Sequence, residues 1–561
     1  MDKKLRLTLI LAKGYFPKEL PPAFTTVDFG NSVHDVMSEW SSSGLFERKP
    51  AKKYQGKKKS GAYVYKVISA EAELISAAKR GFERRSLHIT HPIPQALLAY
   101  EMCHNWKTIQ KWLALQAFSL DRISVTPTAF RSIPEIKFEA HRAKKAFIEA
   151  TANWLVKTDI TRFYPSIYTH SIPWAAYGKE KVKKRITLYD GSLADRLDQL
   201  TRACNRNQTV GIPIGPETSR IIAEVISSRI DHRFFDKMLD VDASSIDRLQ
   251  DDWFVGCSSL EQADLVLSRI TLAYREFALD INGSKTSIER TSSISEQQWV
   301  SELGAFLAHC NGVPTGRRLS EFLSLGLRMQ VAYPHQPVAN YLISTIENSK
   351  IRRSDAATVE SFLLRIATLS PISLSGVSRV LINLHHDTKS VSVQRVTKRI
   401  RQELRRHSTN GNTLEVIWLL YTLRGLSSSV KVSDVAEYIE KPSSSAICLV
   451  LLDMQARGLV VGSLPKQEWA AQIDDDVSRS SGLWLLSYEG IRHGWLPDPH
   501  SLAGKPFFKP MLDRNIVFYD PRRNVPTTQT TVRRRRRDRA RARLETFQLT
   551  QHLRGFDVEE Y

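Results

Sequence analysis

Apolar and polar positions alternate near the middle of the chain in a way that predicts a strand hairpin. In SSIDRLQDDWFVG, residues 244–256, apolar side chains at Ile246, Leu249 and 253–255 surround two adjacent carboxylates, Asp251 and Asp252. Consecutive residues of a strand point to opposite faces of a sheet, and burying an unpaired carboxylate is costly. The doublet therefore needs a partner that offsets this cost.

The pattern predicts further elements on both sides of this hairpin. WLVKTDITRFYPSI (154–167) is expected to open as a strand that leads to Asp159, and GIPIGPETSRIIAEVISSRI (211–230) predicts a Gly/Pro loop running into a helix. Helices are also predicted over 94–118 and around 261–278, and a turn over 279–288.

After about residue 350 apolar residues recur at helical spacing. Three stretches show this pattern, and the second of them has a strongly basic opposite face: AATVESFLLRIATL (356–369), VSVQRVTKRIRQELRRH (391–407) and NTLEVIWLLYTL (412–423). The pattern predicts a stack of helices, although no repeat is regular enough to indicate a solenoid.

The composition of the chain indicates a polyanionic partner. A chain of 561 residues is expected to form two or three domains. It has 80 Lys plus Arg against 59 Asp plus Glu, a net charge of +21, which favours nucleic acid first and an anionic membrane surface second. The apolar runs are too short and broken for a transmembrane span. Five scattered cysteines without a CxxC motif indicate a reducing cytosol and no structural zinc.

Two basic segments are candidate phosphate contacts. The first is an expected loop, RKPAKKYQGKKK (48–59), and the second an arginine block, VRRRRRDRARAR (532–543). The alternatives are a merely solvated loop and a disordered basic tail. The candidate nucleic-acid contacts in them are Lys52, Lys53, Lys57, Lys58, Arg533, Arg534 and Arg535.

Divalent metal ions offset the cost of the acidic doublet. Carboxylates that are expensive to bury become favourable when they hold such ions. One aspartate at a strand end, Asp159, together with the doublet on a hairpin, is the set of residues that a two-metal site needs. Two Mg²⁺ ions, with Mn²⁺ as a substitute, about 3.5–4 Å apart would activate a 3′-hydroxyl and stabilise a leaving pyrophosphate.

Four stretches in order, VKTDITRFYPSI, QTVGIPIGPETSRIIAE, RLQDDWFVG and LDINGSKTS, resemble the consecutive palm motifs of reverse transcriptases. GYFPKELPPAFTT, IYTHSIPWA and WLLSYEG…NIVFYD are similar to the bacterial abortive-infection and defence-associated group. The resemblance implies an α+β fold of right-hand fingers and palm, followed by an all-α, HEAT-like part. The implied divisions are an N-terminal and fingers region (1–150), a palm (151–310), a helical thumb or repeat-like domain (311–480) and a C-terminal segment with the arginine-rich tail (481–561).

The resemblance also implies roles for individual residues. Asp159 and Asp251 match the metal-binding carboxylates, Asp252 the third acid and Ile160 a backbone-carbonyl ligand. Tyr164 matches the aromatic gate that excludes a 2′-hydroxyl and so favours dNTPs.

Further residues match nucleotide-binding positions, although two departures from the family pattern occur. Leu249 stands where these enzymes usually have a tyrosine that contacts the primer, and Ile214 where they usually have a glutamine. Both departures leave the metal-binding acids intact. The implied nucleotide-binding residues are Gln208, Gly211, Pro213, Gly215, Lys285, Arg84, Arg85 and Arg142.

The function that the resemblance implies is a cytoplasmic bacterial DNA polymerase of an antiphage system. It would be RNA-directed, or template-independent and possibly protein-primed, and would form homo-oligomers through its C-terminal helices. Its partners would be dNTPs, an RNA template or companion non-coding RNA, and the DNA product. One alternative is a retron or group II intron type enzyme; the HNH or Cys/His module that would favour the intron version is not visible. Another is a catalytically inactive palm that binds RNA, against which the intact set of three acids argues.

Overall fold

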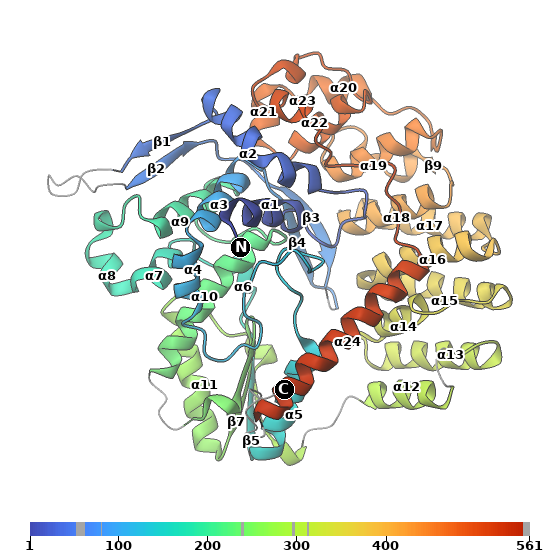
Figure 1. Ribbon diagram of the computed structural model, residues 1–561. Coiled ribbons are helices and arrows are strands. Elements are labelled where there is room, and N and C mark those ends of the chain that lie inside the picture. The colour runs from blue at the N-terminus through green and yellow to red at the C-terminus, as the bar shows by residue number, and fades with distance from the viewer. Residues whose placement is uncertain (52–61, 80, 237–240, 294–297, 311–313, 554–561) are drawn as a thin grey trace.

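Mixed α/β structure in the first half of the chain is followed by helices (Figure 1). This computed structural model describes residues 1–51, 62–79, 81–236, 241–293, 298–310 and 314–553. The expected α+β part with a helical part after it is confirmed. One detail of the all-α expectation is wrong, because β9 (Val430–Lys431) and β10 (Val460–Val461) form a short parallel pair.

A four-stranded antiparallel sheet, the palm sheet, carries the hairpin and the strand that the sequence predicts. Its order is β6-β7-β5-β8, and Thr158 lies opposite Trp253. The strands are β5 (Trp154–Thr158), β6 (Ile246–Leu249), β7 (Asp252–Cys257) and β8 (Ser287–Arg290).

Helices cover both faces of the palm sheet. Leu155 and Phe254 pack on Ile148 of α5 (Phe138–Thr151), while Val156 and Val255 face the main core under α11 (Leu260–Arg275). Helix α5 comes so close that a Cβ at Gly256 would lie 2.7 Å from the Ile148 side chain. A glycine is therefore required at this point of β7.

The predicted helices are largely confirmed, with one correction. The Gly/Pro loop leads into α10 (Glu217–Phe235), and the helix expected around 261–278 is α11. The single helix expected over 94–118 is wrong, because α3 (Pro92–His104) and α4 (Trp106–Leu113) are separate. Asn105 lies between them with non-helical backbone angles, and its side-chain amide donates to the carbonyl of Glu101. Such local bonds compete with helix continuation.

Two hairpins lie between α2 (Val27–Ser42) and α3 in the sequence. Part of the basic segment 48–59 is strand rather than loop, and the candidate contacts Lys52, Lys53, Lys57 and Lys58 lie outside the described residues. The hairpins pair β1 (Phe46–Pro50) with β2 (Tyr63–Val67) and β3 (Glu73–Ala78) with β4 (Arg84–Ile89). The remaining helices of this half are α1 (Lys3–Gly14), α6 (Phe163–Ser166), α7 (Ser171–Tyr177), α8 (Lys179–Lys184) and α9 (Leu193–Ala203).

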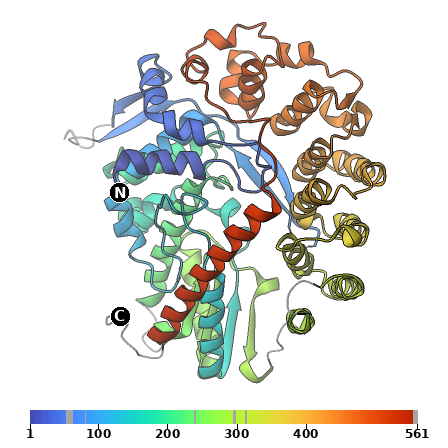
Figure 2. The same ribbon diagram turned by 45° about the vertical axis from the view of Figure 1, so that its right-hand side comes forward.

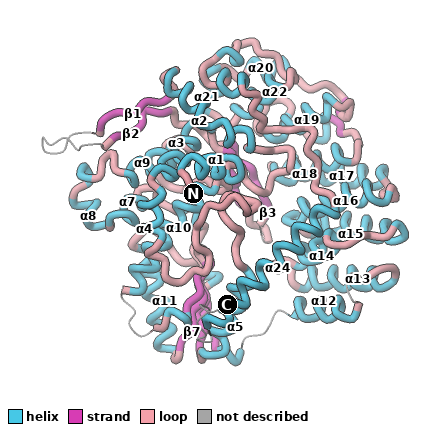
Figure 3. The backbone as a smooth tube through the Cα atoms, in the orientation of Figure 1, coloured by secondary structure: helices cyan, strands magenta, loops and turns pink. Residues whose placement is uncertain are grey.

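The second half is a stack of helices along one side of the molecule, and strands are concentrated in the first half (Figures 1 and 3). The three helices predicted after residue 350 are confirmed as α15, α17 and α18. The stack consists of α12 (Gln298–His309), α13 (Arg317–Ala332), α14 (Val338–Glu347), α15 (Ala356–Leu369), α16 (Leu374–Thr388), α17 (Val393–Thr409), α18 (Thr413–Gly425) and α19 (Ser445–Ala456), followed by α20 (Lys466–Ala471), α21 (Asp475–Ser480), α22 (Trp484–Arg492) and α23 (Lys509–Asp513).

Two segments far apart in the sequence pack together and join the two halves. The ring of Phe16 lies 6.5 Å from that of Trp484 and 5.9 Å from that of Phe518. Phe24 forms a backbone bridge with Tyr519. GYFPKELPPAFTT and NIVFYD therefore share one buried aromatic cluster.

The arginine block lies on a helix, α24 (Thr528–Leu553). The disordered-tail alternative is therefore wrong for these residues. The helix runs from the stack to α5, beside which its far end lies (Figure 2). Arg535 donates to Ser344 and Glu347 of α14, and the Arg534 guanidinium lies 5.0 Å above the Phe130 ring. Two of the three arginines predicted to contact nucleic acid thus have partners within the chain, while Arg533 is exposed.

The five cysteines carry free thiols, consistent with their spacing in the sequence. Within the described ranges, no helix combines the length and apolar character needed to cross a membrane.

The β3–β4 hairpin is fastened to the helical stack by polar contacts. The backbone amide of Ser76 donates to Thr413 Oγ1. The carboxylate of Glu73 accepts from Ser444 Oγ at 2.7 Å and from the amide of Ala446 at 3.0 Å, at the N-terminus of α19. Its other oxygen is buried without a partner, and burial raises the pKa of Glu73 to about 7.

Glu73 should make the stability of the protein depend on pH. Its pKa is higher in the folded state than in the unfolded chain, so its favourable contribution is complete below about pH 4.5 and is lost as pH rises through about 7. We expect Glu73→Gln to reduce, by a few kcal/mol, the fall in unfolding free energy over this window. Urea titrations at several pH values measure it, with Glu71→Gln, an exposed neighbour, as the control. An unchanged slope in Glu73→Gln would contradict the assignment.

Candidate active site

Two acids distant in the sequence meet at one end of the palm sheet. Asp159 directly follows β5, and Asp251 lies in the turn between β6 and β7. Because β5 and β7 are antiparallel with Thr158 opposite Trp253, the next position along β5 comes level with this turn. The carboxyl group of Asp159 is close enough to that of Asp251 to raise its pKa, and Asp159 is only 7% exposed. The sheet register thus creates the carboxylate pair.

The charges of this site are poorly compensated. Burial, followed by the charges of Asp252 and Asp159, raises the pKa of Asp251 to about 8. Asp252 opens β7 and is exposed. Neighbouring carboxylates in a low-dielectric site disfavour each other's ionisation, so a cation is needed before all three acids ionise at neutral pH. Oxygen-rich sites of this composition suit Mg²⁺ and Mn²⁺.

A lysine supplies part of the missing positive charge. Lys285 Nζ donates to Asp159 Oδ2 from the turn η3 (Gly283–Lys285). Burial opposes the charged ammonium, but the bond to Asp159 and the charges of Asp159 and Asp252 outweigh it and raise the pKa of Lys285. The amide of Asn282 donates to the Asp159 carbonyl at 2.7 Å. The turn predicted over 279–288 is thus attached directly to the first acid.

Ile160 lies beside this attachment. It forms an isolated bridge with Ile281, built by bonds from Thr161 N to Asp280 O and from Asn282 N to Asp159 O. The bridge therefore does not use the carbonyl of Ile160, which is the group expected to bind metal.

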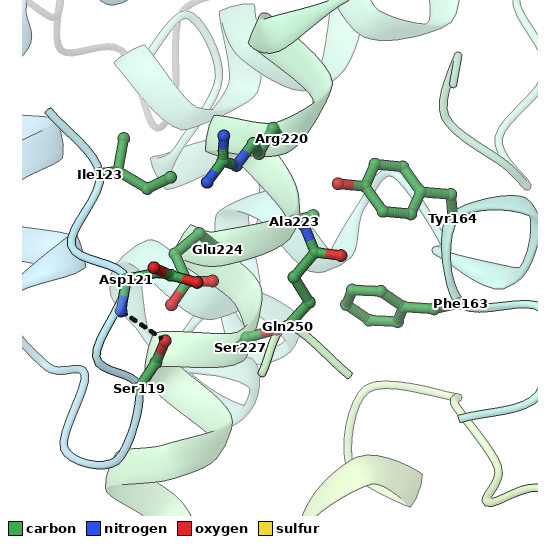
Figure 4. A pocket seen from close by; sticks show the side chains of 10 residues that line it. All are labelled: Ser119, Asp121, Ile123, Phe163, Tyr164, Arg220, Ala223, Glu224, Ser227 and Gln250. Carbon is green, nitrogen blue, oxygen red and sulfur yellow. Dashed lines mark hydrogen bonds between the residues drawn. The ribbon is translucent and has the colours of Figure 1, made fainter. Parts of the chain in front are cut away.

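Tyr164 lies on α6 and lines a small pocket next to the acids. Figure 4 shows Phe163 and Tyr164 on one side of the pocket, Arg220 and Glu224 of α10 opposite, and the side chain of Gln250 between them. The other lining residues are Ser119, Asp121, Ile123, Ala223 and Ser227. Burial raises the pKa of the Tyr164 hydroxyl, with the charge of Asp251 acting in the same direction. The tyrosine is therefore neutral and close to the second acid.

The Gly/Pro loop is hydrogen-bonded to the segment that carries Tyr164. The amide of Gly211 donates to Ile167 O and that of Ile212 to Tyr164 O. Gly211 has a φ of +88°, and a Cβ there would meet the Pro165 carbonyl at 3.2 Å, which favours glycine. Gly215 has a φ of +133°. Pro213 is buried and Gln208 is exposed.

The structure gives one of the three expected cations a different partner. The Arg84 guanidinium donates to both carboxylate oxygens of Glu415 on α18, at 3.1 and 2.8 Å. Its predicted nucleotide contact stays a prediction and would require it to leave this ion pair. Arg85 on β4 and Arg142 on α5 are exposed.

Several residues near the acids were missed from sequence. Glu83, at the tip of the β3–β4 hairpin, lies in the field of Lys285 and Asp159, and Arg220, Glu224 and Gln250 line the pocket. Gln250 belongs to the turn that the sequence predicts. The other residues come close to the acids only through long-range packing, which no local pattern indicates.

The acids are not arranged as a complete metal site. Among the described residues, no three Asp, Glu, His or Cys side chains are grouped as they would be around a metal ion. Asp159 and Asp251 form a pair, and the ammonium of Lys285 supplies part of the positive charge that a metal ion would otherwise provide. The donor set fits Mg²⁺ chemically, and Lys285 contacts Oδ2 of Asp159, one of the oxygens that would bind it.

Comparisons with known proteins give a limited result. No protein-family model and no curated protein matches the sequence. Apo telomerase from Candida tropicalis matches with a TM-score of 0.29 and 10% identity over 80% of this chain and 74% of that chain. Telomerase from Candida albicans in complex with a TWJ fragment of telomeric RNA matches with a TM-score of 0.25 and 10% identity over 74% and 68%. Likeness at this level supports no conclusion about activity.

The repulsion at Asp251 predicts that its removal stabilises the metal-free protein. A carboxyl whose pKa is raised in the folded state contributes stability below about pH 4 that is lost as pH rises through about 8. We expect Asp251→Asn to raise the unfolding free energy at pH 8.5 by roughly 1–3 kcal/mol in the presence of EDTA. Denaturant melts measure this, with Asp264→Asn, at an exposed position of α11, as the control. A less stable Asp251→Asn protein at that pH would contradict the proposed repulsion.

Proposed function

We propose that this chain is a reverse-transcriptase-type nucleotidyltransferase that adds dNTPs to a 3′-hydroxyl or a protein hydroxyl. The observation that supports this most is the carboxyl pair of Asp159 and Asp251 at one end of an antiparallel sheet, with Lys285 and Tyr164 beside it. In the reaction, the hydroxyl oxygen forms a bond to the α-phosphorus, its proton is lost and the bond to pyrophosphate breaks.

The proposed metal ligands are Asp159, Asp251, Asp252 and the carbonyl of Ile160. Two Mg²⁺ ions, or Mn²⁺, would lower the pKa of the attacking hydroxyl and neutralise the leaving pyrophosphate. Lys285 would exchange partners in this scheme: with a cation bound at Asp159, its ammonium would be free to contact the triphosphate. Because its side chain is 45% exposed, it can reach outward without a change in the fold.

The selectivity for deoxynucleotides would come from Tyr164. Its ring lies beside Asp251, where the sugar of a bound nucleotide would meet it. Backbone bonds from Gly211 and Ile212 attach this segment to the Gly/Pro loop, which would limit movement of the tyrosine backbone away from a 2′-hydroxyl. Gln208, Pro213 and Gly215 belong to the same supporting loop.

The proposed partners follow from charge and from the sequence resemblance. A net charge of +21 favours nucleic acid, and we propose an RNA template or companion RNA together with the DNA product. The antiphage role, the bacterial cytoplasm, synthesis without a template and assembly through the helical stack are proposed on the sequence resemblance alone.

A second candidate is a palm that binds RNA without catalysis. The observations that favour it are the Lys285–Asp159 ion pair and the lack, among the described residues, of three side chains grouped around a metal position. The two candidates differ in whether dNTPs are consumed.

Incorporation of labelled dNTPs by purified protein, with Mg²⁺ or Mn²⁺, tests the proposal. Asp251→Asn is expected to reduce the rate by about 1,000-fold or more, because losing a metal ligand removes several kcal/mol of transition-state stabilisation. Asp264→Asn should retain the wild-type rate. Sequencing the co-purifying RNA and the DNA product distinguishes templated from untemplated synthesis. No metal-dependent incorporation by the wild-type protein, or full activity in Asp251→Asn, would contradict the proposal.

A further inference from the structure

A fully buried arginine connects helix α10 to the turn that carries Asp251. Arg248, on β6, is 0% exposed. Its Nε and Nη2 donate to the two carboxylate oxygens of Asp231 at 2.7 and 2.8 Å, and Nη2 also donates to Glu224 Oε1 at 2.7 Å. Both acids belong to α10. Nη1 lies 3.5 Å from Glu224 Oε2, and its second N–H donates to a different partner.

That partner is the backbone of the hairpin turn. Arg248 Nη1 donates to the carbonyl of Gln250 at 2.7 Å, and this carbonyl belongs to the peptide group that joins Gln250 to Asp251. Gln250 has a φ of +58°, a region that non-glycine residues adopt with some strain. A charged donor on its carbonyl therefore fixes the orientation of a strained peptide directly before the second acid.

The other face of β6 is fixed in the same way. Asp247 is fully buried and bonds to His141 Nδ1 of α5 at 2.8 Å, while His141 Nε2 lies 3.3 Å from Asp121. Neighbouring residues of the strand thus have ionic partners on opposite faces of the sheet. A register slip of one residue would exchange the two faces, so these contacts hold the hairpin in one register.

Stability alone does not account for the Arg248 cluster. Buried ion clusters of this kind add little stability compared with apolar residues of the same volume, although removing one member is costly. Two carboxylates facing one guanidinium also leave excess negative charge, and burial raises the pKa of Asp231 to about 6. The cluster is better explained by the geometry that it gives to the turn.

We propose that Arg248 is a positioning residue for Asp251, holding the Gln250–Asp251 peptide so that the Asp251 carboxylate faces Asp159 and binds a divalent cation together with it. This inference rests on the proposed function of the site. Arg248 itself does not touch substrate or metal and acts through the Gln250 carbonyl.

The test compares two arginine-to-lysine substitutions in the full-length protein. Arg248→Lys keeps the charge but loses the planar fork that reaches Asp231, Glu224 and the turn together. The matched control is Arg424→Lys in the helical stack. Arg424 is also buried, and it donates to Asp453 at 2.5 Å and to the carbonyl of Pro521. Both variants are checked for folding by circular dichroism and thermal melts.

The main readout is the affinity for Mn²⁺ alone, measured from the electron paramagnetic resonance signal of the free ion. We expect Arg248→Lys to weaken binding by about 10- to 100-fold, the usual effect of losing a residue that orients a metal ligand, and Arg424→Lys to leave it unchanged. The Mg²⁺ concentration for half-maximal dNTP incorporation should rise in parallel. If Arg248→Lys does not fold, Asp231→Asn, which keeps Arg248 in place, should show a smaller loss in the same direction.

The outcomes separate this inference from the proposed function. A folded Arg248→Lys protein with wild-type Mn²⁺ affinity overturns the positioning role while leaving the proposed function intact, as does an equal loss in both lysine variants. A wild-type protein that binds no Mn²⁺ overturns the proposed function and the inference with it.

Discussion

The mutual repulsion of Asp159 and Asp251 is the constraint on which the rest of the site depends. The register of β5 and β7 places the two acids together, and burial of the pair raises the pKa of Asp251 to about 8. The repulsion is limited by the raised pKa of Asp251, which favours its neutral form, and by the ion pair between Lys285 and Asp159. Both features are reversible, which is compatible with the cation binding that we propose for this site.

The elements around Asp159 and Asp251 are held together by buried ion pairs and hydrogen bonds. In the β6–β7 hairpin, strand β6 is connected to α10 through Arg248 and to α5 through His141, by buried ion pairs. The β3–β4 hairpin is attached to the helical stack through Ser76, Glu73 and Arg84. In this arrangement the helical stack supports the β3–β4 hairpin.

Local patterns predicted the palm sheet and its acids from the sequence, because each motif contains its own strand or turn. The hairpin around Asp251, the strand before Asp159 and the turn at Lys285 all follow from short-range alternation and turn residues. Long-range partners did not follow. Arg84 was expected near a nucleotide but pairs with Glu415 of α18, which is more than three hundred positions away, and no local signal marks that contact. Arg248 offered one signal, a charged residue in a hairpin that was expected to be buried, but its partners on α10 depend on packing. The break at Asn105 was missed because apolar periodicity continues across it.

Diffraction from crystals of the protein with Mn²⁺ and a non-hydrolysable dNTP, recorded at the manganese absorption edge, tests the central claim most directly. The account predicts an anomalous peak within coordinating distance, about 2.0–2.4 Å, of carboxylate oxygens from both Asp159 and Asp251, with the Lys285 ammonium displaced from Asp159. Manganese bound to one of these acids alone, or no manganese with the Lys285–Asp159 pair intact, would contradict it.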